Sequence, residues 1–496
     1  MTSALQARQA GLTDNPPEQA HGGQRRRRES WFARDPAWPI VLTLAGWPVW
    51  WLLGLGSFIF PILAIPMVRR MYRWRVSGER TIRVPPGFGW WALFLLVVVL
   101  SVAELSLPAP GTLQSPVSHR LIAWAIRAID YGAVTIMFLY AGNLTERELP
   151  RKRLAWLLGL VGIYTLVGGL GGVVYPHLQL TSPLAAVVPQ SIQASDSTIS
   201  LLLHPGLSQA SNLLGYATGR PTAPFIYTNM WGECLAILLP WLLVVMWAYG
   251  TRRRRQYAIG VLLIALVPIV YSLDRGLWIG IGLSILYLAV RYAAQGRVAL
   301  LVGLCGVLVL VVFVVLVTPL QGMITTRLQH GKSNSSRASL SLLAIQDVKS
   351  SPFLGYGDTR HMQGSQNSIT VGRSAKCSGC GQRVVGGNGQ LWLLLITTGV
   401  LGTVFYLGFF AYGSLRYWRD RTPYGVAGTL VLLLGFVYMF VYQAIGPPLA
   451  FTMLAYVLLW RNDRVLNHGE PSADDPSGRT IAASAPGGAV TAGASA

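Results

Sequence analysis

The stretch VLLIALVPIVYSLDRGLWIGIGLSILYLAV (261–290) consists of two apolar runs joined by the polar turn SLDRGLW (272–278). Each run approaches the length of roughly 20 residues that a helix needs to cross the hydrocarbon core of a bilayer. Asp274 and Arg275 stand side by side where most neighbours are Val, Leu, Ile or Gly. The stretch therefore predicts two membrane-spanning helices with two charged side chains at the turn between them.

The composition of the whole chain places it in the same class. Of its 496 residues, 52% are hydrophobic and only 12% are charged, whereas soluble globular proteins carry about 25% charged residues. Many other apolar runs are also near the length needed to cross a bilayer. We therefore predict an all-α polytopic membrane protein.

The formal net charge of +21 is compatible with nucleic-acid binding, but the positions of the arginines favour another interpretation. They gather in short runs between apolar segments, as residues that determine membrane topology do. Such runs lie at 25–28, 69–75, 151–153 and 252–255. Membrane lipids are therefore the expected surroundings, and no nucleic-acid partner is expected.

About twelve membrane-spanning segments are predicted from apolar runs and the charged, Pro or Gly residues that separate them. The first two could instead form a hairpin that crosses only part of the membrane. The predicted segments are 37–53, 55–69, 88–107, 121–142, 154–175, 225–249, 257–273, 276–294, 298–318, 389–411, 424–442 and 446–460.

Two tails flank the predicted transmembrane domain, which covers 37–460. The segment 1–36 is polar and basic, and 461–496 is rich in Ala, Gly, Ser and Pro, so both are expected to be disordered. No signal peptide is evident, because no small-residue cleavage site closes the first apolar run.

The positive-inside rule orients the predicted segments in a cytoplasmic membrane, with both termini and the arginine-rich short loops in the cytoplasm. The loops 108–120, 176–224 and 319–388, together with the turn 273–275, then face outward. Long loops are exempt from the charge rule, so the Lys and Arg residues of 319–388 do not oppose this orientation. Three separate polar pieces of chain therefore meet at the extracytoplasmic face.

The first polar piece ends in GRPTAPFIYTNMWGE (219–233), which contains Arg220. Asn229 and Glu233 are four residues apart and would share one face of a helix. Asn229 is a candidate for substrate binding, but it could equally cap the start of the helix. Glu233 could make an ordinary interfacial contact.

The second polar piece is the turn with Asp274 and Arg275. Polar side chains near membrane depth tend to be functional, and the planar fork of arginine suits phosphate oxygens. We predict an anion-binding role for Arg275 and an orienting role for Asp274. The alternative is a solvated ion pair at a helix end, which would contribute little.

The third polar piece lies in SNSSRASLSLLAIQDVKSSPFLGYGD (333–358). Leu340, Leu343, Ala344 and Val348 have helical spacing, so we predict an amphipathic helix on the outer membrane surface.

Arg337 is expected in the first turn of this helix, where a cation opposes the helix dipole. A bound anion would explain its position. Alternatively, Arg337 faces lipid headgroups.

The same loop contains CSGC, with Cys377 and Cys380. One CxxC without further Cys or nearby His is weak evidence for zinc, and the oxidising conditions outside the cell favour a small disulfide instead. We predict no metal site and no cofactor. His361, also in this loop, could act as a base, although a lone His in a polar loop usually has no role.

Four segments, in this order, resemble those of a known family: GRPTAPFIYTNMWGECLAILLP (219–240), YSLDRGLWIGIGLSILYLAV (271–290), SSRASLSLLAIQDVKSSPFLGYG (335–357) and GGNGQLWLLLITTGVLGTVFY (386–406). The family is the bacterial O-antigen ligase and O-antigen polymerase superfamily. The resemblance implies a fold similar to the type C glycosyltransferases. It also implies metal-independent glycan transfer from an undecaprenyl-pyrophosphate-type lipid carrier to an acceptor at the outer face of the membrane. By the same resemblance, Arg220, Arg275 and Arg337 would bind the pyrophosphate.

The chain departs from the family at one position that matters for mechanism. The family usually has a His eleven residues before a Gly, and this His is proposed as the base. Gly399 is present here, but the residue eleven positions earlier is Asn388. Asn cannot accept a proton at physiological pH, yet its amide can orient an acceptor hydroxyl. Asp358, His361 and Glu233 are the candidate bases. Alternatively, departure of the leaving group supplies most of the driving force.

The expected reaction is an inverting transfer, in which Arg275 and Arg337 stabilise the departing pyrophosphate and Asn388 orients the acceptor. Two alternatives stay open: a flippase or transporter of a lipid-linked envelope precursor, and a non-catalytic paralogue in an envelope-assembly complex. A transporter would need charged residues near the bilayer midplane. Arg127 and Asp130 are one helical turn apart, and we interpret them as an internal ion pair.

Overall fold

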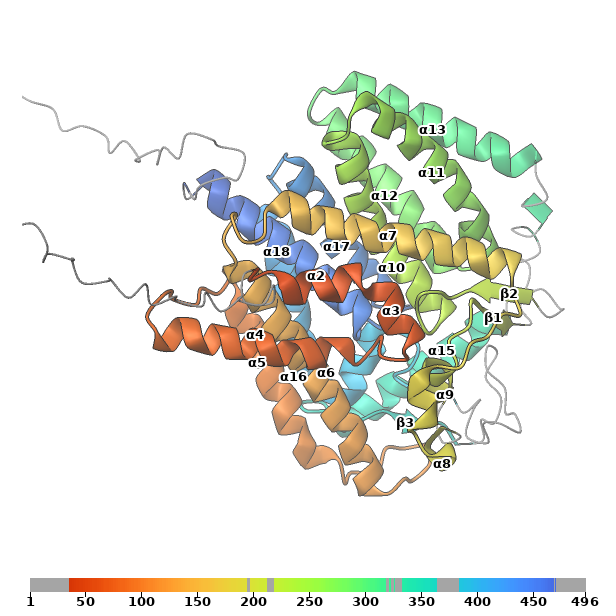
Figure 1. Cartoon of the computed structure of the whole chain (residues 1–496). Helices are drawn as coiled ribbons and strands as arrows, with labels where there is room; N and C mark the ends of the chain where they lie inside the picture. The colour runs from red at the N-terminus through yellow and green to blue at the C-terminus, as the bar shows by residue number, and fades with distance from the viewer. Residues whose placement is uncertain are drawn as a thin grey trace, which may run out of the picture. The chain divides into compact units, whose positions relative to one another are not determined.

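The computed structural model describes residues 35–193, 197–211, 218–317, 321–322, 325, 332–363, 383–467 and 469 (Figure 1). The predicted tail 1–36 lies almost wholly outside these ranges, and the CSGC motif with Cys377 and Cys380 lies entirely outside them. The described chain is mostly helical, in agreement with the predicted all-α class.

Six helices in the described part of the chain are long and apolar enough to cross a membrane, which indicates a membrane protein. They are α6 (Val117–Asn143), α7 (Arg151–Val174), α10 (Thr228–Leu243) with its π-helical continuation Val244–Ala248, α11 (Arg252–Tyr271), α12 (Arg275–Ala293) and α16 (Gln390–Tyr417). Two shorter apolar helices accompany them: α5 (Phe88–Leu100), which continues as a 3₁₀ turn to Glu104, and α17 (Pro423–Tyr438).

The predicted count of about twelve spans is not matched by the six long apolar helices of the described ranges. The predicted span 37–53 forms two short helices, α2 (Trp38–Ala45) and α3 (Trp47–Leu52), which are separated at Gly46. The helix that follows, α4 (Ile59–Val76), ends in the arginine-rich run RRMYRWR. The apolar composition of a segment does not show where a helix breaks or where charged residues begin. Counting apolar segments therefore overestimates the number of membrane-spanning helices.

Two further helices complete the bundle. α13 (Val298–Val317) is apolar throughout, and α18 (Pro447–Asn467) is longer than the predicted span 446–460. Every side chain of α18 from its first residue to Asn462 is buried, so this helix lies inside the bundle, against α6, α10 and α17. The predicted disordered tail therefore starts too early, because Arg461 still packs inside the protein.

α7 and α10 pack closely because one face of α7 has glycines at the contact. A Cβ atom on Gly159 or Gly162 would touch the backbone or Cβ of α10, and one on Gly169 would lie 2.5 Å from the Trp231 ring. Small residues at such positions let membrane helices approach each other. The contact is completed by the Trp231 indole N–H, which donates a hydrogen bond to the Thr165 carbonyl of α7 (2.9 Å).

The helices run between two ends of the bundle, which we name after a buried carboxylate at each. α10, α12 and α16 begin at the Asp274 end, whereas α7, α11 and α17 begin at the Glu146 end. The arginine runs 69–75, 151–153 and 252–255 lie at the end of α4 and at the starts of α7 and α11. All three runs therefore share the Glu146 end.

Short antiparallel strand pairs and one helix lie near the Asp274 end. β1 (Ser208–Ser211) pairs with β2 (Thr218–Pro221), so that Gln209 is opposite Arg220. β3 (Arg360–His361) pairs with β4 (Val384–Val385).

α15 (Lys332–Ser350) packs against α16. Its Leu340 and Ala344 are buried in a small core with Tyr356 and Ile396. The expectation that these apolar residues face the membrane surface is therefore wrong.

α16 is interrupted at Gly399, whose φ of +62° and ψ of −164° are not helical. A left-handed φ of this kind is readily adopted only by Gly. The loop after α15 docks at the interruption: the Val400 N–H donates to the Pro352 carbonyl (2.7 Å), and the Tyr356 N–H donates to the Ile396 carbonyl (2.7 Å). The segment SPFLGYG (351–357) thus completes the backbone hydrogen bonding of a broken helix.

Candidate functional site

The turn SLDRG positions its two charged residues through its backbone. Leu273 is buried and has a φ of +52°, a left-handed conformation that is costly for a residue with a branched side chain. The Ser272 hydroxyl accepts a hydrogen bond from the Asp274 N–H (3.2 Å), and the Asp274 carboxylate accepts one from the Gly276 N–H (3.2 Å). Asp274 therefore caps α12, and Arg275 is the first residue of this helix.

Asp274 is held in a closely fitted, buried position. The Tyr442 hydroxyl donates a hydrogen bond to its Oδ1 (2.5 Å). A Cβ atom on Gly232 of α10 would lie 2.7 Å from its Oδ2, and one on Gly276 would overlap the Tyr442 hydroxyl. The absence of side chains at these two glycines leaves the room that Asp274 and Tyr442 occupy.

Three arginines from separate segments lie within electrostatic range of this carboxylate. Arg220 on β2 is buried, and its Nε donates to the Ser272 carbonyl (2.5 Å). Arg337 on α15 lies close enough to interact electrostatically with Arg220, Asp274 and Arg275. We call Arg220, Asp274, Arg275 and Arg337 the arginine–aspartate cluster. The structure thus brings together the polar pieces that the sequence analysis expected to meet.

The electrostatics of the cluster are dominated by burial. Burial raises the pKa of the Asp274 carboxyl, and the Arg220 charge, the Tyr442 hydrogen bond and Arg337 offset this only in part. Burial likewise lowers the pKa of the Arg220 guanidinium, although the Asp274 charge acts in the opposite direction. With three guanidinium groups to one carboxylate, the cluster favours an anionic ligand.

Asn388 joins the two chain segments beside Arg337. Its Nδ2 donates to the Arg337 backbone carbonyl (3.2 Å) and to the Ser341 hydroxyl (2.9 Å). Its Oδ1 is buried and has no hydrogen-bond partner among the described residues, so this oxygen has an unused capacity to accept a hydrogen bond.

The position of Arg337 in its helix differs from the prediction. α15 begins at Lys332, five residues before Arg337, so the arginine is in the second turn and not the first. The helix dipole acts mainly within the first turn. The dipole argument for an anion at Arg337 therefore fails, and the case rests on the neighbouring Arg220 and Arg275.

Asp358 forms an ion pair with Arg127, which was predicted to pair with Asp130. The Arg127 Nη2 lies 2.9 Å from the Asp358 Oδ1, and the Arg127 Nη1 donates to the Gly357 carbonyl. The expected ion pair between Arg127 and Asp130 is therefore wrong as the main pairing of this arginine. The loop that carries Asp358 docks onto α6 and supplies a closer partner than the residue one turn away.

The remaining predicted residues lie apart from the hydrogen bonds of the cluster. His361 belongs to β3, where its backbone carbonyl accepts from the Leu113 N–H (2.8 Å). Asn229 is the second residue of α10 and does not cap it, because the N-cap is Tyr227 and no side chain caps this end.

Glu233 is almost fully buried, one residue after Gly232, and its charge interacts with that of Asp274. It also borders a cavity of about 30 Å³, together with Gln390 and Tyr406. Neither the contact of Tyr442 with Asp274 nor the role of Gly276 was predicted from the sequence. The only available signal was the spacing of Gly276 and Gly280, four residues apart on one helix face, because small residues at this spacing admit a close neighbour.

Within the described ranges, no three His, Cys, Asp or Glu side chains gather in a way that could hold a metal ion. Comparison of the chain with protein-family profiles and with curated proteins gives no match.

Proposed function

We propose that the chain transfers a glycan from a polyprenyl-pyrophosphate-type lipid carrier to an acceptor, at the Asp274 end of the bundle. The observation that carries this proposal is the arginine–aspartate cluster, in which arginines from β2, α12 and α15 surround one carboxylate. Such an excess of guanidinium groups beside apolar helices suits a lipid with a diphosphate headgroup. The resemblance to the O-antigen ligase and polymerase superfamily supports the same assignment.

The arginine runs favour one orientation in the membrane. They share the Glu146 end, and the positive-inside rule assigns such an end to the cytoplasm. The Asp274 end would then face the extracytoplasmic side of a cytoplasmic membrane, with both termini inside the cell. Lipid-linked glycans destined for the cell surface are available on that side.

The proposed step is a displacement at the anomeric carbon of the lipid-linked sugar. The acceptor hydroxyl oxygen forms the new glycosidic bond, and the bond to the diphosphate oxygen breaks with its electron pair moving to the diphosphate. Arg275 and Arg337 stabilise the charge that develops there, and Asp274 orients Arg220 and Arg275. The Asn388 Oδ1 holds the acceptor hydroxyl.

The acceptor proton needs a base, and the three candidates differ in their surroundings. Asp358 is engaged by Arg127, and His361 belongs to the β3–β4 pair. Glu233 borders a cavity and follows Gly232, which packs against Asp274. We therefore propose that Glu233 is the base that accepts the proton of the acceptor hydroxyl.

The direct test is a transfer assay with a lipid-linked glycan, using the full chain in nanodiscs. Arg275→Lys and Arg337→Lys keep the charge but lose the planar fork, so transfer should fall, towards the 100- to 1000-fold loss expected when one preorganised charge-stabilising donor is removed. Arg253→Lys, at the exposed start of α11, is the matched control and should transfer normally. If both cluster variants keep full transfer, the pyrophosphate role is wrong.

The product that accumulates on deletion of the protein separates the possible reactions. Unlinked, lipid-carried polymer would indicate a ligase, and single repeat units would indicate a polymerase. Accumulation of the precursor on the cytoplasmic side would instead indicate a flippase and would overturn the proposed transfer.

A further inference from the structure

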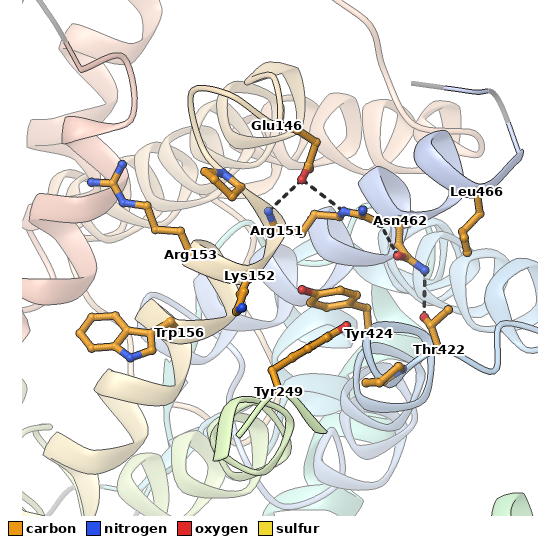
Figure 2. Close-up of a pocket in the computed structure, with 12 residues that line it drawn as sticks. Glu146, Arg151, Lys152, Arg153, Trp156, Tyr249, Thr422, Tyr424, Asn462 and Leu466 are labelled. Carbon is orange, nitrogen blue, oxygen red and sulfur yellow. Dashed lines mark hydrogen bonds and ion pairs between the residues drawn. The ribbon is translucent and has the colours of Figure 1, made fainter. Parts of the chain in front are cut away.

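A second polar site lies at the Glu146 end, at the opposite end of the bundle from the arginine–aspartate cluster. It is a pocket of about 600 Å³ (Figure 2). α7 and α17 begin at this pocket, the π-helical segment Val244–Ala248 finishes beside it, and the last turns of α18 also contribute to it. Pockets of roughly 300–1,000 Å³ are the usual size for small ligands and headgroups.

The pocket is lined by more positive than negative charge. Arg151, Lys152 and Arg153 form the first turn of α7, and Glu146 is the only carboxylate among the described lining residues. The first turn of α7 contains no acidic residue, and the Glu146 carboxylate accepts the backbone N–H of Arg151 at its start (3.2 Å). One carboxylate does not balance three cations, so the net positive charge of the lining favours an anion.

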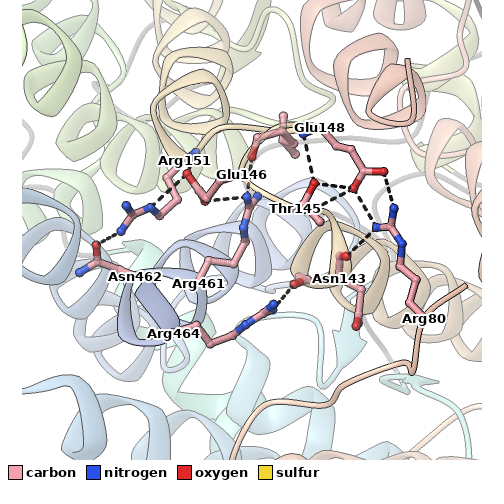
Figure 3. A network of polar contacts seen from close by, with 11 residues as sticks. Arg80, Asn143, Thr145, Glu146, Glu148, Arg151, Arg461, Asn462 and Arg464 are labelled. Carbon is pink, nitrogen blue, oxygen red and sulfur yellow. Dashed lines mark hydrogen bonds and ion pairs between the residues drawn. The ribbon is translucent and has the colours of Figure 1, made fainter. Parts of the chain in front are cut away.

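The carboxylate of Glu146 is already occupied (Figure 3). Its Oε1 accepts from the Arg461 Nη2 (2.7 Å), and its Oε2 lies 3.4 Å from the Arg151 Nε. Arg151 in turn donates to the Asn462 Oδ1 (2.5 Å). These contacts fix the inner wall of the pocket and leave Lys152 and Arg153 as the basic residues nearer the surface.

Aromatic side chains form the other wall. Tyr249 and Tyr424 lie with their ring centroids 5.4 Å apart, and the Lys152 Nζ lies 5.9 Å from the Tyr249 ring. Trp156 is 48% exposed and Leu466 is 56% exposed, so both offer apolar surface at the rim. Aromatic residues beside basic ones at the end of spanning helices are typical of the membrane interface.

We propose that this pocket binds the phosphate of an anionic phospholipid headgroup, with Lys152 and Arg153 contacting the phosphate and Trp156 contacting the acyl chains. A lipid is favoured over a soluble phosphate compound because the rim is apolar and lies at the end of membrane-spanning helices. Basic pockets between such helices on the cytoplasmic side are suited to anionic lipids. The pocket is remote from Asp274, so this ligand is independent of the proposed glycan transfer.

The test uses the full chain in nanodiscs of equal parts phosphatidylcholine and phosphatidylglycerol, released for native mass spectrometry. The double variant Lys152→Gln/Arg153→Gln should retain roughly 25-fold less phosphatidylglycerol, because each basic residue near an anionic surface contributes about a factor of five. Arg252→Gln/Arg253→Gln removes the same charge from exposed positions at the same end and should retain phosphatidylglycerol like the wild type.

Three outcomes would overturn the proposal. One is equal retention by both double variants and the wild type, and another is equal loss from both double variants. The third is displacement of phosphatidylglycerol from the wild type by millimolar inorganic pyrophosphate, which would identify a soluble phosphate compound as the occupant. Thermal unfolding of each variant checks that it is folded, and Lys152→Gln alone, at an exposed position, repeats the test with a smaller change.

Discussion

The two ends of the bundle both gather arginines around carboxylates, but they do so in different proportions. At the Glu146 end, Arg151 and Arg461 share Glu146, and Arg80 holds both oxygens of Glu148 (2.6 and 2.8 Å). At the Asp274 end, three arginines surround one carboxylate. The close ion pairs of Glu146 and Glu148 hold helices together, whereas at the Asp274 end the guanidinium groups outnumber the one carboxylate.

The pKa values of the carboxyl groups also differ between the two ends. Burial raises the pKa of Glu148, but hydrogen bonds from Arg80 and Thr145 outweigh it, so that its pKa is lower than usual. At the other end, burial dominates and the pKa of Asp274 is higher than usual, despite the arginines nearby. We therefore expect substitutions at the Glu146 end to change stability and substitutions at the Asp274 end to change activity.

The largest effect is expected for Glu146→Gln. It leaves Arg461, which is 3% exposed, without its charged partner, and breaking a buried ion pair costs about 3–5 kcal/mol. Denaturant unfolding in detergent, followed by tryptophan fluorescence, measures the loss. Adding Arg461→Met should recover part of it, because an apolar residue replaces the stranded charge. A stable variant that had lost transfer would contradict the division between the two ends.

Arg337→Gln should give the converse result at the Asp274 end. We expect transfer to fall by roughly 100- to 1000-fold, since a charge-stabilising donor is lost, and the free energy of unfolding to change by less than about 1 kcal/mol. Steady-state transfer and unfolding, measured on one preparation, check both. Loss of stability with normal transfer per folded molecule would place Arg337 among the structural arginines.

Gly276→Ala tests how closely the cluster is fitted. The added Cβ would overlap the Tyr442 hydroxyl, displace it from Asp274 and cost about 1–3 kcal/mol by overpacking. Gly282→Ala, in the same helix, is the matched control because a Cβ there meets nothing within 4 Å. Unfolding and transfer are measured for both, and equal behaviour of the two variants would show that Tyr442 does not need this space.

Asp347→Asn should change how stability depends on pH. Burial raises the pKa of the Asp347 carboxyl to about 6, so the folded protein holds this proton more tightly than the unfolded chain. The resulting stability is present below the ordinary pKa of 3.8 and is lost as pH rises to about 6. Asn should remove this loss, on the order of 1–2 kcal/mol at pH 7. Unfolding between pH 4 and pH 7 measures the slope, and an unchanged slope would be the contrary result.

Glu148→Gln should have the smallest effect and the opposite slope. The pKa of Glu148 is lowered, so its contribution is present above its ordinary pKa of 4.5 and is lost as pH falls below that value. The pair is partly exposed, and such pairs contribute about 0–1 kcal/mol. Unfolding at acid and neutral pH should show the difference between the variant and the wild type only at neutral pH.

Much of the fold could be predicted from local pattern. The apolar runs of 261–290 form α11 and α12, with Asp274 and Arg275 at the turn, because helix length and the polar turn are encoded in the stretch itself. The alternation of predicted spans placed the polar pieces that carry Arg220, Arg275 and Arg337 at one face. That the three arginines share one ligand was implied only by the family resemblance.

Long-range partners could not be predicted in this way. The sequence shows Arg127 one turn from Asp130, but Arg127 pairs with Asp358, which is 231 positions away. The partners Glu146 and Arg461 are 315 positions apart, and neither stands out locally. Such pairs depend on how loops and helices dock, which no spacing rule contains.

The interruption of α16 at Gly399 has a mechanical consequence. The loop after α15 is fastened to the break through Pro352 and Tyr356, and Asn388, just before α16, is fastened to α15 beside Arg337. α15 and the first half of α16 are thus connected at two places: at the interruption of α16 at Gly399, and at Asn388 just before α16. Because Asn388 donates to the Arg337 backbone carbonyl, a shift of this turn of α15 on diphosphate binding would also move Asn388, and the proposed donor and acceptor sites would change together.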